Sequence, residues 1–215
     1  MANRSEPGPG RPRARPGPSP SVSVEDIVEA AVSLADARGP ASVTMRSVAD
    51  RVGLSAPGLY RHVASREEMI GLMVDRISSQ VVHPPATGDW VGDLTRVAQQ
   101  QVELFRQHPW MAEAVGSLHS LGPQVLEHLE WGLAVLREVH ASTRDKLEAI
   151  ALVNGLATLF AAPAPPLGPQ AFALLDPRSH PLLTAALVNA GDTTPSQTLF
   201  ERAVEGLLHS MLGDG

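Results

Sequence analysis

Hydrophobic positions recur at helical spacing along most of this 215-residue chain, and no segment alternates hydrophobic with polar residues over a length useful for a strand. The pattern therefore predicts an all-α fold. The helices predicted for the later part of the chain span residues 90–107, 109–117, 122–139, 143–162, 179–190 and 196–212. Prolines and glycines, such as Pro109 and the Gly122-Pro123 pair, separate these spans.

Four shorter helices are predicted before residue 90. Ser23 and Asp26 form a capping-box pattern at the start of the first, which ends near Arg38-Gly39-Pro40. Ser65 and Glu68 repeat this pattern at the start of the fourth. The fourth helix carries apolar positions toward Pro84-Pro85, and the proline pair is expected to mark its end.

Residues 44–66 contain the two middle helices, joined by a tight turn. Thr44 is placed to cap the first of them, and Gly53 suits the left-handed position that ends it. Ser55 caps the second, which is expected to run from Ala56 to His62. A turn of three to four residues with a glycine lets two helices cross steeply. The segment is therefore interpreted as a helix-turn-helix, whose second helix enters the major groove of DNA.

Four arginines against a single acidic residue, Asp50, give this segment a charge of +3. Arg46 and Arg66 are expected to bind backbone phosphates, and Arg61 is expected to reach a phosphate or a guanine edge. The full set of predicted DNA-contacting residues is Thr44, Met45, Arg46, Ser55, Ala56, Pro57, Gly58, Tyr60, Arg61, His62 and Arg66. A plain three-helix unit with solvated arginines is the alternative interpretation.

The distribution of charge favours the DNA-binding interpretation. Residues 1–66 hold nine arginines against six acidic residues, whereas residues 67–215 hold eight basic against seventeen acidic residues. An acidic remainder repels DNA, so the binding face is expected within the first third of the chain.

The stretch Gly53-Leu54-Ser55-Ala56-Pro57-Gly58-Leu59-Tyr60-Arg61-His62-Val63 resembles the recognition-helix signature of the TetR family of bacterial transcriptional regulators, with residues 59–62 its most diagnostic part. Asp89-Trp90 followed by Leu94, the run 105–110 and the run 130–133 are similar to the tetracycline-repressor type of C-terminal domain. The resemblance covers roughly residues 23–213. It implies a homodimeric repressor that binds palindromic operator DNA and is released by a small-molecule effector.

With this resemblance the chain divides into three parts. Residues 1–22 form an arm rich in Arg, Pro and Gly, expected to be disordered. Residues 23–68 form the DNA-binding domain, and residues 69–215 the helical effector-binding and dimerisation domain. The arm either contacts DNA or is an inert solvated tail. Deleting residues 2–20 distinguishes these two interpretations, because an unchanged affinity and salt dependence would contradict DNA contact.

Two helices carry the signal for self-association. The helix from Asp145 to Ala162 is apolar on nearly every side after its first turn, and a second copy of the chain is the economical cover for such a surface. The last predicted helix, residues 196–212, is the second of the two. In the TetR family, the corresponding two helices form a four-helix dimer interface. The predicted interface residues are Ile150, Ala151, Gly155, Leu156, Leu159, Leu199, Val204, Leu207, Leu208 and Met211. Complete burial within one subunit is the alternative.

The effector site is predicted where aromatic and amphipathic residues gather in the middle helices, because ligand pockets are mostly apolar with a few placed polar groups. The candidates are Gln101, Phe105, His108, Trp110, Met111, Leu118, His119, His128, Trp131 and Asn154. The alternative for each of them is an ordinary place in the core.

Other kinds of chemistry have little support in the sequence. The chain has no cysteine, no Gly-X-Ser-X-Gly, no phosphate-binding glycine loop and no His-Glu-X-X-His motif. We therefore expect no catalytic residues, no metal and no cofactor. A metal sensor using His119, Glu127 and His128, or a dimeric binding module with a degenerate DNA-binding head, remains as the alternative. No apolar stretch is long enough to span a bilayer, so no membrane partner and a cytoplasmic location are expected.

Overall fold

The computed structural model describes residues 22–118, 120–162, 172–189 and 197–213, and within these ranges it contains helices and no strand. The all-α prediction is confirmed. The helices are α1 (Val24–Arg38), the 3-10 turn η1 (Pro40–Ser42), α2 (Met45–Val52), α3 (Ala56–Leu59), α4 (Arg66–Ser78), α5 (Trp90–Gln107), α6 (Met111–Gly116), α7 (Pro123–Val135), α8 (Thr143–Ala161), α9 (Pro181–Asn189) and α10 (Gln197–Leu212). Nearly all of the predicted arm, residues 1–21, lies outside the described residues.

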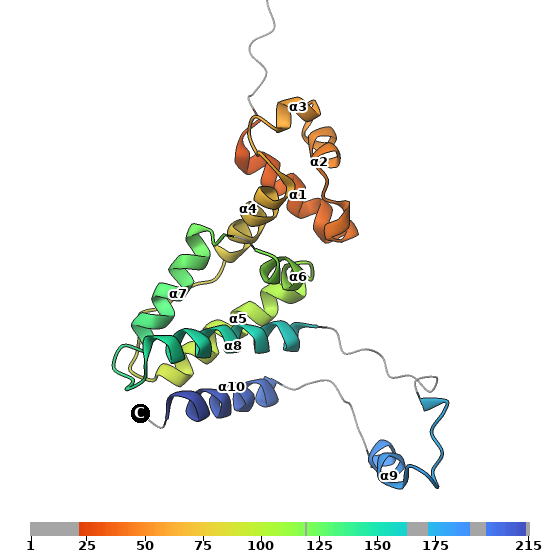
Figure 1. Cartoon of the computed structure of the whole chain (residues 1–215), viewed down its shortest axis with the longest axis vertical. Helices are drawn as coiled ribbons and strands as arrows, with labels where there is room; N and C mark the ends of the chain where they lie inside the picture. Colours follow the sequence, from red (N-terminus) through yellow and green to blue (C-terminus); the bar gives the residue numbers. More distant parts are fainter. Residues whose placement is uncertain (1–21, 119, 163–171, 190–196, 214–215) are drawn as a thin grey trace, which may run out of the picture.

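Apart from α9, which lies away from the others, the helices form two groups that α4 joins (Figure 1). We call α1, η1, α2 and α3 the head, and α5 to α8 with α10 the body. In the head, α1 packs against α2 and α4, and α2 packs against α3. In the body, α8 packs against α5 and α10, while α7 lies against α4, α5 and α8. α4 therefore belongs to both groups, and any change in its tilt moves the head relative to the body.

Side-chain caps begin the helices of the head where the sequence predicts them. The Thr44 hydroxyl accepts from the Ser47 backbone N–H at 3.0 Å, and the Ser47 hydroxyl accepts from the Thr44 backbone N–H at 3.0 Å. Gly53 ends α2 with a left-handed φ of 72°. The Ser55 hydroxyl then accepts from the Gly58 backbone N–H. The start of α2, its end and the start of α3 are thus fixed within twelve residues.

Three predicted helix ends are wrong, and one of them is the end of α7, which lies at Val135 rather than at residue 139. The second helix of the helix-turn-helix ends at Leu59 rather than His62, and residues 60–62 continue as turns. α4 ends at Ser78, before the prolines, and the chain continues through a turn at residues 79–80 to a segment held by Gln100 of α5. The Gln100 carboxamide both accepts from the Val82 backbone N–H and donates to the Val82 carbonyl, each at 3.0 Å.

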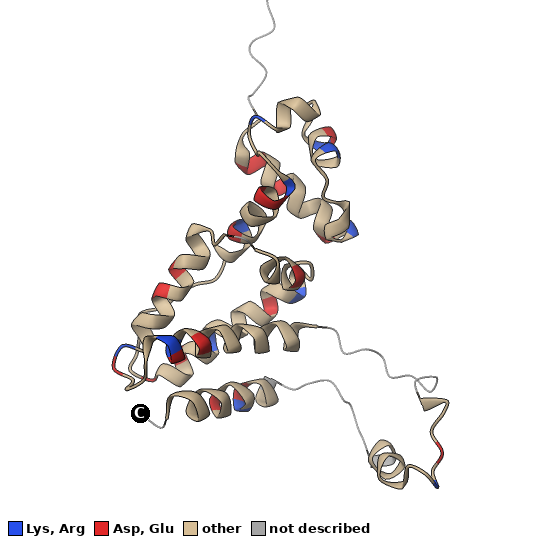
Figure 2. Ribbon diagram, in the orientation of Figure 1, with Lys and Arg blue, Asp and Glu red and all other residues tan. Residues whose placement is uncertain are grey.

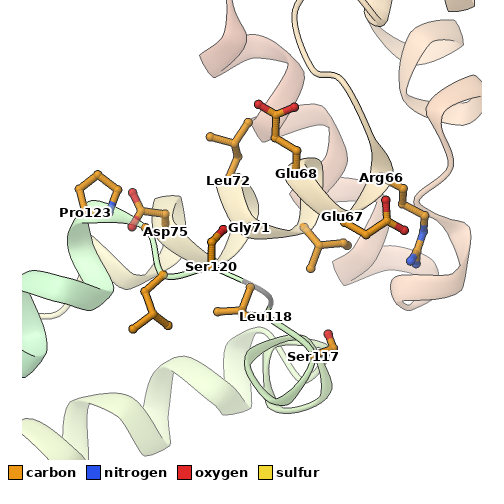
Figure 3. Close-up of a pocket in the computed structure, with 13 residues that line it drawn as sticks. Arg66, Glu67, Glu68, Gly71, Leu72, Asp75, Ser117, Leu118, Ser120 and Pro123 are labelled. Atoms are coloured by element: carbon orange, nitrogen blue, oxygen red, sulfur yellow. The ribbon is translucent and has the colours of Figure 1, made fainter.

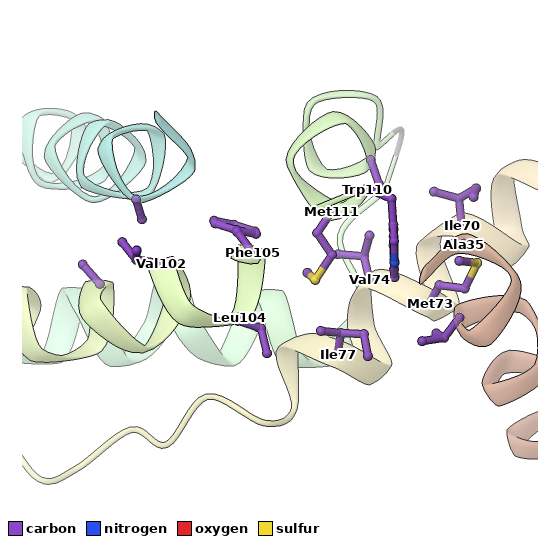
Figure 4. Close-up of a cluster of buried hydrophobic side chains, with 14 of the residues drawn as sticks. Ala35, Ile70, Met73, Val74, Ile77, Val102, Leu104, Phe105, Trp110 and Met111 are labelled. Atoms are coloured by element: carbon purple, nitrogen blue, oxygen red, sulfur yellow. The ribbon is translucent and has the colours of Figure 1, made fainter. Parts of the chain in front are cut away.

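Asp36, near the end of α1, holds the head against the body. Its Oδ1 accepts from the indole N–H of Trp110 at 2.7 Å and lies 2.8 Å from Nδ1 of His108. Trp110 is only 3% exposed, and its ring lies between hydrophobic residues of α4 and the first residue of α6, Met111 (Figure 4). Burying an aromatic ring together with its satisfied N–H stabilises the contact between the two groups of helices.

Asp75 attaches α4 to the body. Its Oδ1 accepts from the backbone N–H of Gln124 at 2.7 Å, so it caps the start of α7, where the local N-cap residue, Gly122, supplies no side chain. A Cβ built on Gly122 would overlap this carboxylate. Only a glycine at 122 therefore lets Asp75 reach α7, beside a groove of about 480 Å³ between α4 and residues 117–123 (Figure 3).

Gly122→Ala is expected to lower the free energy of unfolding by about 1–2 kcal/mol, because the added methyl displaces Asp75 from its backbone partner. Urea denaturation measures this loss. Gly116→Ala is the matched control, since a Cβ at Gly116 meets no atom within 4 Å. The effect of Gly122→Ala is expected to disappear in the background of Asp75→Ala; full additivity would contradict the assigned contact.

Candidate functional site

The turn after α3 presents three polar side chains to solvent. Tyr60 is 52% exposed, and Arg61 and His62 are also exposed. Arg46, on the first turn of α2, is exposed as well. The side chain of neither Arg46 nor Arg61 makes a hydrogen bond or ion pair with another residue of the described ranges. These guanidinium groups are thus available to phosphates or base edges.

The other two arginines of the segment hold the head together. Arg66 donates through Nε to the Val43 carbonyl at 2.8 Å and through Nη2 to the Pro40 carbonyl at 2.9 Å. Arg51 donates to the Ser33 hydroxyl at 2.8 Å, which ties α2 to α1. The guanidinium of Arg66, predicted to bind phosphate, is therefore engaged in the structure of the head, a role that the sequence did not reveal.

The remaining predicted DNA contacts differ in their exposure. Thr44, Ser55 and Pro57 are exposed, while Met45 and Ala56 are half-buried. Gly58, which was expected on the DNA-facing side with Ala56, is buried against Leu54 and Ser55. Its place inside the head corrects that expectation, because the short α3 turns this residue toward α2. The hydroxyl groups of Thr44 and Ser55 are engaged as helix caps.

Acidic residues accompany the basic ones in the head, and they also lie along α7 and α8 of the body (Figure 2). Within the head, the carboxylates of Glu29 and Asp36 are engaged by Arg76 and by the Trp110 indole. The exposed edge formed by α2 and the turn after α3 carries Arg46 and Arg61 without ion-pair partners among the described residues. Asp50 is also exposed on α2, and the arginines outnumber it on this edge.

A small cavity of about 70 Å³ lies between the end of α4 and helices α5, α6 and α7. Of the predicted effector residues, Gln101, Phe105, Met111 and His128 line it. Trp131 and Asn154 line a narrower void on the other side of Gln101 and His128. His108 and Trp110 lie instead at the Asp36 contact, which corrects their assignment to the site. Leu118 lines the groove beside α4, and His119 lies outside the described residues.

Two histidines form the polar part of this cavity. Nε2 of His83 lies 3.0 Å from Nδ1 of His128, and Nε2 of His128 lies 3.2 Å from Oδ1 of Asn154. Both rings contact the Trp131 ring, whose N–H donates to the Pro84 carbonyl at 2.7 Å. His83 was not predicted, because it follows a helix end beside two prolines and therefore belongs to no periodic pattern.

Burial lowers the pKa of both histidines. For His83 the removal of solvent dominates and the charge of Glu127 opposes it. For His128 the removal of solvent again dominates, the hydrogen bond with Asn154 opposes it, and the charge of His83 lowers the pKa further. Both imidazoles are therefore neutral at pH 7 in the empty cavity.

The predicted dimer residues divide into buried and exposed sets. Ile150, Val204 and Leu208 are fully buried within one subunit, so for these three the expectation of an intersubunit position is wrong. They fill the space between α5, α8 and α10, with the Ile150 side chain against Gly132. Leu156, Leu207 and Met211 are half-buried.

The exposed set lies along one face of α8 and at the start of α10. It consists of Ala151, Gly155, Leu159 and Leu199, with Leu152 beside them. Leu159 is 66% exposed, and a Cβ at Gly155 would meet no atom within 4 Å. We call the α8 residues of this set, 151, 152, 155 and 159, the α8 stripe. It is an apolar surface with a shallow site where another backbone can approach.

Comparison with known proteins gives the family. The family model described as bacterial regulatory proteins, tetR family, matches residues 27–72, and the model described as Tetracyclin repressor-like, C-terminal domain, matches residues 84–162. The first contains the helix-turn-helix. The second contains the residues of α5, α6 and α7 that line the cavity of His83 and His128, which we call the histidine cavity; His83 itself lies one residue before the matched range. The chain belongs to the TetR family. The resemblance inferred from the recognition-helix motif is thereby confirmed.

Two curated relatives of this TetR-family chain are similar over part of their length. The chain is 34% identical over 136 residues to the HTH-type transcriptional repressor DrrR1 of Streptomyces coeruleorubidus, covering 62% of this chain and 50% of that protein. It is 30% identical over 131 residues to an HTH-type transcriptional regulator of Saccharopolyspora erythraea, covering 60% of this chain and 56% of that protein. The chain thus spans about half the length of these curated relatives.

Solved structures of the family share the fold. Apo ActR of Streptomyces coelicolor superposes with a TM-score of 0.74 at 23% identity, covering 89% of this chain and 95% of ActR. ActR in complex with (S)-DNPA superposes with a TM-score of 0.71 at 23% identity, covering 91% of this chain and 100% of ActR. At this identity the likeness concerns the fold alone.

Neither a metal site nor a membrane span is found in the described ranges. No group of three or more histidine, aspartate or glutamate side chains there is arranged to hold a metal ion. No helix there is both long and apolar enough to cross a bilayer.

Arg66→Ala is expected to lower the free energy of unfolding by about 1–3 kcal/mol, because it leaves the Pro40 and Val43 carbonyls without their donor. Arg46→Ala, which removes an arginine without a partner in the described ranges, is expected to change it by less than about 0.5 kcal/mol. Thermal or urea unfolding compares the two variants. Equal stability would show that the Arg66 hydrogen bonds contribute nothing.

Proposed function

We propose that this TetR-family chain is a transcriptional repressor that binds a palindromic operator as a homodimer and is released by a small molecule. The observation that carries the proposal is the exposed edge of the head, where Arg46, Tyr60, Arg61 and His62 face solvent. A helix-turn-helix with unpaired guanidinium groups beside neutral hydrogen-bonding groups suits both phosphate binding and base readout.

The relatives support the regulatory part of the proposal. DrrR1 is named a transcriptional repressor, and the ActR structures contain (S)-DNPA or actinorhodin. We infer a comparable role for this chain, in which a small organic effector binds in the histidine cavity. Such a regulator acts where the chromosome lies, in the bacterial cytoplasm.

The α8 stripe supports the homodimer. An exposed row of leucines with small residues between them is stable in water once it is covered, and a two-fold axis covers it with the same stripe of a second copy. Two heads related by that axis would bind half-sites about 34–36 Å apart, which is one turn of DNA.

Selection from a random duplex pool tests the proposal directly. Purified protein is incubated with the pool at moderate salt, and the bound DNA is sequenced. Recovery of a palindrome supports the sequence-specific regulator and gives the half-site spacing. Recovery of nothing above background would overturn it and favour a binding module whose DNA-binding head is degenerate.

Tyr60→Ala is expected to weaken operator binding by about ten-fold while leaving affinity for random duplex nearly unchanged, because its hydroxyl is assigned to base readout. Arg46→Ala is expected to weaken both and to reduce the slope of log affinity against log salt by about 0.9, the value of one phosphate contact. Fluorescence anisotropy at several salt concentrations measures both effects. An equal loss on both DNAs for Tyr60→Ala contradicts its role.

Leu159→Arg is expected to convert the protein to a monomer, because it places charge in the centre of an apolar interface. Light scattering after size-exclusion chromatography measures the mass, and operator affinity is expected to fall with it, since the two half-sites are then bound independently. Leu126→Arg, at a residue of α7 that is 52% exposed, serves as the control and is expected to remain dimeric. A dimeric Leu159→Arg protein would refute the assigned interface.

A further inference from the structure

The cavity between α4, α5, α6 and α7 carries information about the chemistry of its ligand, provided that the proposed function holds. Its walls are mainly apolar and include the Phe105 ring and Leu104. Apart from Ser78 at the end of α4, the polar lining residues are His83, His128 and Gln101, which meet on one side. A ligand bound here has an apolar body with its polar atoms directed toward the histidines.

The hydrogen bonds of the pair leave one acceptor open. Oδ1 of Asn154 accepts from Nε2–H of His128 at 3.2 Å, so Nδ1 of His128 is the acceptor for Nε2–H of His83. In that arrangement the other nitrogen of His83, Nδ1, carries a lone pair and no proton. Protonation of the pair therefore places the additional proton on His83 first, without breaking either of these hydrogen bonds.

Gln101 adds an unmet hydrogen-bonding need. Its Nε2 lies 3.3 Å from Nε2 of His128, and its Oε1 is buried with no partner among the described residues. Because Nε2–H of His128 donates to Asn154, it cannot accept from the Gln101 amide, whose nitrogen therefore has no acceptor there. Turning the carboxamide over lets its oxygen share that N–H and leaves the amide nitrogen without a partner among the described residues. A buried polar atom without a partner costs free energy that a ligand atom can recover.

The charges around the cavity select the sign of the ligand. Of the residues that line it, only His83 and His128 are titratable. The nearest charge that acts on the pair is that of Glu127, which is exposed on α7 and raises the pKa of His83 against the larger effect of burial. A cation entering the cavity meets no lining carboxylate. An anion makes the protonated imidazole favourable.

We propose that the effector is a small organic acid whose anionic oxygen binds the His83–His128 pair, and that the pair takes up one proton from solvent as the ligand binds. The ligand enters as its carboxylate or phenolate. One solvent proton adds to the open nitrogen of His83, and the complex holds an imidazolium beside an anion. The apolar body of the ligand packs against Phe105 and its neighbours.

The pH dependence follows from this proton uptake. The bound anion raises the pKa of the pair above its value in the empty cavity. Proton uptake is complete at pH values between the pKa of the pair in the empty cavity and its pKa in the complex, and affinity for the anion declines as pH rises through that window. Above the pKa of the complex, the anion meets a neutral pair and loses its ionic partner.

The test uses probes that share a ring and differ in charge: 2-naphthoate, 2-naphthamide and 2-naphthylmethylammonium, with benzoate, benzamide and benzylammonium as a smaller set. Titration calorimetry of the full-length protein at pH 7, in phosphate and in Tris, gives the number of protons taken up from the difference in apparent enthalpy. The expected result is that the acid of at least one ring size binds with uptake of about one proton per subunit, that the amide binds at least ten-fold more weakly, and that the ammonium compound does not bind.

Variants separate the histidine pair from general apolar binding. His83→Gln is expected to abolish proton uptake and to weaken the acid by at least ten-fold, while affinity for the amide changes less than three-fold. His140→Gln, at an exposed histidine after α7, is the control and is expected to match wild type in all titrations. Unchanged proton uptake in His83→Gln would assign the proton elsewhere and overturn the proposal.

The remaining outcomes are also decisive. Preference for the amide or the ammonium compound, or binding of the acid without proton uptake, overturns the assigned ligand class. Because selection of operator DNA requires no ligand, a recovered palindrome without binding of any probe overturns this inference and leaves the proposed function in place. Probe binding with proton uptake but no palindrome supports the ligand class and overturns the regulator.

Discussion

The carboxylate of Asp36 is the interaction on which the arrangement of this molecule depends. One oxygen receives both the indole N–H of Trp110 and the imidazole of His108, and in this way α1 is attached to the start of α6. Asp75 makes a comparable attachment from α4 to the first turn of α7. Without these contacts, the head would be joined to the body chiefly through α4. With them, the start of α6 holds α1 through Asp36, and α7 holds α4 through Asp75. Both α6 and α7 are also walls of the histidine cavity.

The residues that line the cavity and those that make the two attachments are close neighbours in α6 and α7. Met111 lines the cavity, and the residue before it, Trp110, binds Asp36. His128 lies on α7, one turn of helix after Gln124, whose backbone binds Asp75. A ligand that displaces α6 or α7 therefore acts on residues in contact with the head. The physical basis for coupling is a short series of packed and hydrogen-bonded groups rather than a long path.

Much of the local structure could be predicted from sequence because short-range chemistry determines it. Thr44, Gly53 and Ser55 act within three residues of their own positions, so the start and end of α2 follow from residue type alone. The early end of α4 could not be predicted, because it depends on Gln100, which is eighteen residues away from Val82. The structural role of Arg66 has the same cause, since its acceptors lie more than twenty residues earlier in the chain.

The site was predicted less completely than the fold for a related reason. The gathering of aromatic and amphipathic residues in the middle helices pointed to Gln101, Phe105, Met111 and His128, but His83 lies on a segment without regular secondary structure. Tryptophan is a residue type common in ligand pockets, yet the indole N–H of Trp110 donates to Asp36. In the predicted interface, Ile150 and Val204 are buried within the subunit, whereas Leu159 is exposed. Sequence alone does not distinguish these cases, since both kinds of position are apolar.

The hydrogen bonds that Arg66 makes to two carbonyls of the head have a mechanical consequence. They join the first residue of α4 to the segment before α2, so the head follows α4 as a rigid body instead of bending at its root. With thirteen residues, α4 is about 20 Å long at 1.5 Å per residue. A tilt of about 5° about its cavity end therefore shifts its other end by about 2 Å. The helix works as a lever, and a displacement too small to alter the fold becomes large compared with the tolerance of a hydrogen bond to a base.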